Sequence, residues 1–305
     1  MNRFVLSIFA VLLSGNLFGQ MFPLSDHYTF NTLVINPAFA GCSDALSASV
    51  SYRTQWVGFQ DAPKSYLLSV HTPIDNDRMG LGLLMVNNSL GIYRETSFIG
   101  NYAYRRELYQ GTIALGLGFG AIVFNNAWHE LEVADADDDL LTDNPESAVL
   151  PDFSVGTYYY TEKYFVGISL PLFLSHELDQ SSKKYKIKND FSAYNYFFTG
   201  GYEATLSPRI KLLPSFLIKY QPGHAVQVDF NTQLNIRDRI WMGIGYRSGK
   251  MLVGMLQCQL NDQLRMAYAY DFDLSRTAQY KKGSHEILLN YVFSYTRKIV
   301  GPRQF

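Results

Sequence analysis

Acidic residues cluster in one short stretch of this chain, and clustered carboxylates can bind metal ions. Asp135, Asp137, Asp138 and Asp139 lie in a single segment. Hard cations such as Ca²⁺ are bound by several carboxylate oxygens, but this segment lacks the spacing and the central glycine of an EF-hand loop. We therefore predict a solvated acidic loop, with a cation site as the alternative, and we assign no metal ligand.

The six histidines are scattered along the chain and predict no catalytic site. Neither a G-x-S-x-G nucleophile motif nor an H-E-x-x-H metal motif occurs in the sequence. His285 and Glu286 are neighbours, but adjacent side chains on a strand point to opposite faces. We expect a protein that is not an enzyme, has no catalytic residue and needs no cofactor.

The charge of the chain argues against a nucleic-acid partner. The formal net charge is -1, and no basic stripe is present that could follow a phosphate backbone. One basic stretch contains Lys183, Lys184, Lys186 and Lys188. It could pair with the acidic loop, contact anionic surface sugars or lipid, or serve solubility alone.

Apolar and polar residues alternate through most of the chain beyond residue 43. In residues 224–236, for example, Val228 and Phe230 alternate with Asp229 and Asn231. A period of two is what a pleated strand with two unlike faces requires. One face could contact lipid and the other water, although a soluble sandwich would show the same alternation.

The alternation predicts about fourteen strands, with boundaries uncertain by roughly two to four residues. We expect them at residues 44–53, 64–72, 79–88, 93–107, 111–124, 152–161, 164–171, 194–206, 209–220, 224–236, 239–247, 250–260, 263–273 and 285–297.

The connections between these strands differ in length according to their order in the chain. The even-numbered connections are short, whereas the odd-numbered ones include all the long segments, namely residues 54–63, 125–151, 172–193 and 274–284. Short periplasmic turns, long outer loops and an even number of strands are features of bacterial outer-membrane barrels. The sequence therefore predicts an all-β fold, an antiparallel transmembrane β-barrel in contact with outer-membrane lipid.

The N-terminus has the pattern of a signal peptide. Arg3 is followed by an apolar run at residues 4–13 and then by small or polar residues up to Gly19. The run is shorter than the roughly 18 apolar residues that a membrane-spanning helix needs. The first cysteine, Cys42, is too far from the expected cleavage point for a lipoprotein.

The segment between the signal peptide and the first strand is expected to enter the barrel. A barrel of about fourteen strands is wider inside than the side chains of its own wall can fill. Residues 21–41 include Phe22, Tyr28 and Phe30 and are too apolar to remain in the periplasm. We therefore predict three parts: a signal peptide (1–19), an N-terminal plug or hatch inside the periplasmic mouth (20–43) and the outer-membrane barrel (44–305).

Several motifs, in this order along the chain, resemble the PorP/SprF family of type IX secretion membrane proteins. The first two are INPAFAG at residues 35–41 and YRTQW at residues 52–56. Further matching stretches follow, namely APKS at 62–65, GLG at 80–82, PDFSVG at 151–156, VGIS at 166–169 and SHEI at 284–287. The resemblance covers essentially the whole chain after the signal peptide.

The resemblance implies an outer-membrane barrel of Bacteroidota-type bacteria that works in type IX secretion, surface-adhesin attachment and gliding. Its partners would be a secreted surface adhesin or other components of the type IX machinery. The candidate partner-binding or family-motif residues are Asn36, Pro37, Gly41, Arg53, Gln55, Trp56 and Pro63.

These motif residues also have purely structural interpretations. Asn36-Pro37 favours an extended approach followed by a turn, and Gly41 permits a backbone conformation closed to other residues. Trp56 could anchor the barrel at the membrane interface or form part of a partner surface.

A function of another class remains open from the sequence, namely that of an outer-membrane transporter or porin for small molecules. The residues expected to line the interior are polar: Arg53, Gln227, Asp229, Asn231, Arg265, Asp271 and Asp273. Such a lining argues against a continuous apolar channel but allows the passage of polar solutes.

Overall fold

A computed structural model of the chain describes residues 25–43, 45–74, 78–126, 147–172, 174–179, 184–188, 191–275 and 283–293. The predicted signal peptide at 1–19, the acidic stretch at 135–139 and Lys183 lie outside these residues.

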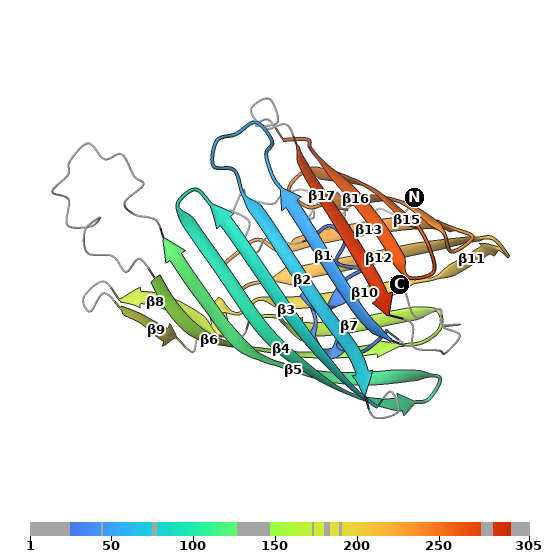
Figure 1. Ribbon diagram of the computed structural model, residues 1–305, viewed down its shortest axis with the longest axis horizontal. Helices are drawn as coiled ribbons and strands as arrows, with labels where there is room; N and C mark the ends of the chain where they lie inside the picture. Colours follow the sequence, from blue (N-terminus) through green and yellow to red (C-terminus); the bar gives the residue numbers. More distant parts are fainter. Residues whose placement is uncertain are drawn as a thin grey trace, which may run out of the picture.

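Long antiparallel strands form one closed sheet (Figure 1). They are β1 (Leu46–Thr54), β2 (Lys64–Ile74), β3 (Met79–Leu90), β4 (Tyr93–Leu108), β5 (Gly111–Asn126), β6 (Ser147–Tyr160), β7 (Tyr164–Leu170), β10 (Tyr196–Tyr202), β11 (Ala204–Ser207), β12 (Ile210–Tyr220), β13 (Gln227–Ile236), β14 (Ile240–Arg247), β15 (Met251–Gln259), β16 (Leu264–Asp273) and β17 (Ser284–Phe293).

Two pairings outside the simple sequential order close the barrel. β1 pairs with β17, and β10 pairs with β12 as well as with β7. Since β10 and β11 both pair with β12, they are two parts of one interrupted strand. Counted in this way, the described residues form a closed antiparallel barrel of fourteen strands, which confirms the predicted fold class.

The predicted strands differ from the observed ones mainly around the longest connections. β6 begins at Ser147, whereas the prediction began at residue 152. The connection expected at residues 172–193 contains a hairpin, β8 (Ser175–Asp179) and β9 (Lys184–Lys188), which forms a separate two-stranded sheet. Each of these strands is too short for its alternation to stand out in the sequence.

Helical structure in the described part of the chain is limited to 3₁₀ turns. They are η1 (Thr32–Val34), η2 (Pro37–Phe39) and η4 (Phe191–Ala193). No helix in these residues has the length and apolarity needed to cross a membrane.

The two faces of the barrel wall differ in polarity. In β13 the side chain of Phe230 is 55% exposed on the outward face, whereas Asp229 is 2% exposed and Asn231 is also buried on the inward face. The other strands also carry large apolar side chains outside. Their inward positions carry buried polar and charged side chains, together with apolar ones such as Leu67 and Leu217 that pack against residues 25–43. An apolar outer band and a polar interior are the arrangement that a bacterial membrane barrel requires.

Strand connections of different length lie at opposite ends of the barrel. The turns near Tyr109, Glu162, Arg237 and Asn261 join strands at one end, which we call the short-turn end. The connections after β1, β5, β7 and β16 are at the other end, which we call the long-link end.

The polarity of the two faces can be tested with an arginine on each. Phe230→Arg is expected to cost about 2–4 kcal/mol of folded-state stability, because it places a charge at the lipid-facing midplane. Gln227→Arg is the control, since Gln227 lies on the inward face and donates a hydrogen bond to Asp229 at 3.0 Å. Assembly yields from heat-modifiable gel migration would give the comparison, and equal losses would contradict the assignment of the two faces.

Candidate functional site

Residues 25–43, which we call the inner segment, lie against the inward faces of strands on opposite sides of the barrel (Figure 1). The Tyr28 hydroxyl accepts a hydrogen bond at 2.7 Å from Asn231 of β13. Asn31 accepts one at 3.0 Å from Ser69 of β2. These contacts on β13 and β2 place the inner segment within the ring of strands.

Arg53 of β1 binds three carboxylates at the long-link end of the wall. It is the penultimate residue of β1, and the period of two turns its side chain inward, where it is buried. Its guanidinium pairs with Asp26 of the inner segment and Asp271 of β16. It also lies 3.2 Å from a carboxylate oxygen of Glu286 in β17.

Asp26 joins a second arginine to this group. Nη2 of Arg247 lies 2.9 Å from one oxygen of Asp26, and Nε of the same arginine lies 3.2 Å from Asp229. The backbone N–H of Asp26 donates to Glu286 at 2.7 Å. We call Asp26, Arg53, Asp229, Arg247, Asp271 and Glu286 the charge cluster.

Burial makes the pairing within the charge cluster necessary. A buried charge without a partner costs several kcal/mol of stability, so each arginine needs its carboxylates and each carboxylate its donors. Burial alone would raise the pKa of Asp26, but Arg53 and Arg247 outweigh that effect and hold the pKa well below its usual range. Asp26 is therefore an anion that links the inner segment to the wall.

His27 occupies the same region without a hydrogen bond to either ring nitrogen from the described residues. Its side chain is fully buried, and that burial lowers its pKa. A neutral imidazole fills this space without adding charge to the charge cluster.

The family-motif residues 36–41 form a tight turn against the wall. The Asn36 side chain caps η2 by accepting a hydrogen bond from the N–H of Ala38 at 2.9 Å, and Pro37 is the first residue of that turn. The Asn36 amide also donates to the carbonyl of Thr157 in β6 at 3.0 Å. Asn36 therefore both caps η2 and attaches this turn to the wall, and the residues before it form η1 instead of the extended approach that the sequence suggested.

Two glycines permit the close approach of this turn. Gly41 has a φ of +69°, and a Cβ there would lie 2.7 Å from the Cα of Gly80. A Cβ at Gly116 of β5 would overlap the backbone of Ala38. Side chains at either position would push the inner segment away from the wall.

The inner segment extends along the barrel and is not confined to the short-turn mouth, where the sequence analysis placed it. Its first residues join the charge cluster, built from strand ends at the long-link end. Its last residues meet Arg105 near the short-turn end, where Nη1 donates to the carbonyl of Ala40 at 2.8 Å. The attachment at Asp26 includes Arg247, which lies more than 200 residues further along the chain.

The remaining candidate residues lie outside the charge cluster, in the first long connection. Gln55 is buried and its N–H donates to the carbonyl of Pro63 at 2.9 Å, which closes the base of this connection. Trp56 is partly exposed and has a left-handed backbone, with φ of +49°. Of the predicted site residues, the structure thus groups Asn36, Pro37 and Gly41 in the inner segment, Arg53 in the charge cluster, and Gln55, Trp56 and Pro63 in the first long connection.

Sequence reasoning found part of the charge cluster. Arg53, Asp229 and Asp271 were expected on the inward face from their parity alone, and they are there. Asp26, Arg247 and Glu286 were missed as partners, and Asp26 belongs to no periodic element. The sequence did contain one indication of a buried charged site: an arginine and several carboxylates occupy inward positions near the same end of the predicted barrel.

Comparison with known proteins gives a family and a fold. The family model described as type IX secretion system membrane protein PorP/SprF matches residues 18–291. The CymD monoaromatic hydrocarbon channel is similar with a TM-score of 0.52 at 12% identity, over 92% of this chain and 96% of that chain. Outer membrane protein Omp33 of Acinetobacter baumannii has a TM-score of 0.49 at 5% identity, over 82% and 99%. No curated protein matches this sequence. At 12% identity the similarity to CymD supports the fold alone.

The charge cluster predicts a large effect of removing one charge. Arg53→Gln is expected to cost about 3–5 kcal/mol, because it leaves buried carboxylates without their partner. Arg209→Gln, at an exposed position in the turn after β11, should cost about 1 kcal/mol or less. The temperature at which the folded barrel converts to the unfolded band on a detergent gel measures both. Equal temperatures for the two variants would contradict the role given to the charge cluster.

Proposed function

The chain belongs to the PorP/SprF family of type IX secretion system membrane proteins, and we propose that it acts by binding a protein partner at the outer membrane. The partner is a secreted surface adhesin or another component of the type IX machinery, in adhesin attachment and gliding. The host is a Bacteroidota-type bacterium. The barrel works by recognition, as neither an enzyme nor a cofactor-dependent protein.

The observation that carries this proposal is the occupied interior. Family-motif residues take part in the attachment of the inner segment to the wall from both partners. Asn36 and Gly41 belong to the inner segment, and Arg53 belongs to the wall. These residues help to hold the inner segment across the barrel interior, which is the space that a passing solute would need. An interior held by buried ion pairs, hydrogen bonds and apolar contacts supports a fixed scaffold over an open channel.

The first long connection offers a surface for the partner. Residues 55–63 carry Phe59, whose side chain is 59% exposed, beside the partly exposed Trp56. Aromatic side chains are enriched in protein–protein interfaces. The base of the connection is held by the backbone pairs of Gln55 with Pro63 and of Val57 with Gly283, so the aromatic groups are presented from a fixed frame.

The rival function is that of a small-molecule transporter. The likeness to the CymD channel concerns the fold and carries no substrate with it. In this chain the charge cluster and Arg105 attach both ends of the inner segment, which supports recognition over transport.

An exposed aromatic at each end of the barrel tests where the partner binds. Phe59→Asn is expected to reduce the partner recovered by cross-linking in intact cells, because it removes the apolar contact at the long-link end. Tyr109→Asn is the matched control, since Tyr109 is 97% exposed in a turn at the short-turn end. Barrel amount in the membrane should be unchanged in both variants. Loss of partner only with Tyr109→Asn would move the binding surface to the opposite end and contradict the proposal.

Conductance in planar bilayers separates recognition from transport. The wild-type barrel is expected to conduct far less than a variant lacking residues 25–40, because these residues cross the interior. Asp26→Asn, a smaller change, should give intermittent openings. A wild-type barrel that conducts as well as the deletion variant would favour the transporter instead.

A further inference from the structure

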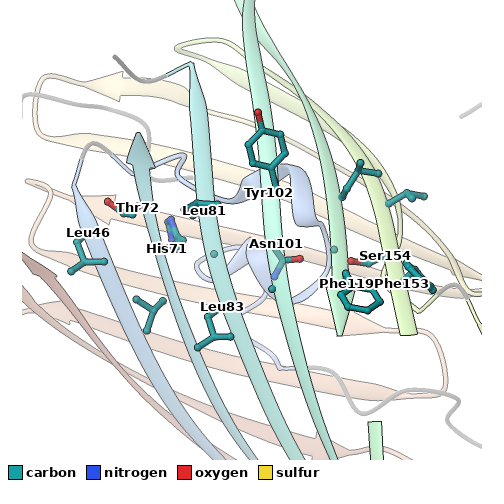
Figure 2. Close-up of a pocket in the computed structure, with 16 residues that line it drawn as sticks. Leu46, His71, Thr72, Leu81, Leu83, Asn101, Tyr102, Phe119, Phe153 and Ser154 are labelled. Carbon is teal, nitrogen blue, oxygen red and sulfur yellow. The ribbon is translucent and has the colours of Figure 1, made fainter. Parts of the chain in front are cut away.

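An apolar groove lies on the outward face of the barrel across β1 to β6 (Figure 2). Its volume is about 710 Å³, within the range of roughly 300–1,000 Å³ found for ligand sites. The walls include outward side chains of neighbouring strands, among them Leu83, Tyr102, Phe119 and Phe153. The groove is thus open to the hydrocarbon that surrounds the barrel.

The floor of the groove is formed where one outward side chain is missing. Gly100 of β4 pairs with Leu83 of β3 and with Phe119 of β5, both of which carry large outward side chains. A Cβ at Gly100 would meet only the carbonyl oxygen of Phe119, at 3.7 Å. The space above Gly100 is therefore free, and a larger residue would occupy it without displacing the wall.

The outward positions that follow Gly100 along β4 change from apolar to cationic. They are Tyr102, Tyr104 and Arg106, the last of which is exposed at the short-turn end. Six residues of strand span about 20 Å. Tyrosine marks the membrane interface in barrels, and arginine is suited to phosphate.

We propose that this groove binds one anionic phospholipid of the leaflet at the short-turn end. One acyl chain lies over Gly100, and the phosphate is bound by Arg106. Lipid tails are as apolar as leucine, so burial from water does not distinguish this site from the rest of the wall. The preference of the lipid for this site comes instead from contacts of its acyl chain with both sides of the groove and from the charge of Arg106.

Two outward glycines provide a matched pair of variants. Gly100→Leu fills the groove. Gly254→Leu adds the same side chain to the outward face of β15, away from the groove, where a Cβ would meet only a ring carbon of Phe272 at 3.9 Å. Delipidated barrel in detergent is titrated with phosphatidylglycerol, and bound lipid is counted by native mass spectrometry. The tightest-bound lipid should weaken about tenfold in Gly100→Leu and remain unchanged in Gly254→Leu, a tenfold change being about 1.4 kcal/mol.

The charge of the headgroup site is tested in the same assay. Arg106→Gln should weaken phosphatidylglycerol and bring its affinity close to that of phosphatidylcholine, which has no net charge. The proposal is overturned if the two glycine variants retain lipid equally or if Arg106→Gln has no effect. It is also overturned if barrel purified from native membranes carries lipid A or a partner's lipid anchor in this groove.

Discussion

The carboxylate of Asp26, held between Arg53 and Arg247, is the contact on which the arrangement of the interior depends. All three groups are buried, and Asp26 is the carboxylate that both arginines share, so its loss would leave the two arginines with no common partner. Asp26 therefore fixes the beginning of the inner segment, and Arg105 fixes its end through the carbonyl of Ala40. The barrel wall supplies the partners for both, which couples the closure of the sheet to the position of the inner segment.

The same alternation of side chains serves the two faces in different ways. Inward positions carry the charge cluster and the hydrogen-bonding groups that bind the inner segment. Outward positions carry the apolar band, interrupted at Gly100 by a groove, and Arg106 follows further along the same strand. Recognition of a protein partner is assigned to the long-link end and lipid binding to the outward wall, so the two proposed functions can be separated by mutation.

The sequence predicted the wall well because membrane barrels impose a period of two and segregate short and long connections. The period of two also assigned Arg53, Asp229 and Asp271 correctly to the inward face. It could not identify Asp26 as their partner, because that residue lies in a non-periodic segment more than 200 residues from most of the cluster. The groove was equally hidden, since it depends on which side chains flank Gly100 on two neighbouring strands.

Cysteine pairs would test most directly whether the inner segment lies within the ring of strands. In a chain whose Cys42 and Cys258 are replaced by alanine, Asn31→Cys is combined with Ser69→Cys, because these side chains are hydrogen-bonded at 3.0 Å. The control combines Asn31→Cys with Tyr66→Cys, on the outward face of the same strand. Our account predicts a disulfide in outer membranes for positions 31 and 69 and none for 31 and 66. A folded barrel in which the first pair stays reduced, or the second pair forms, would contradict it.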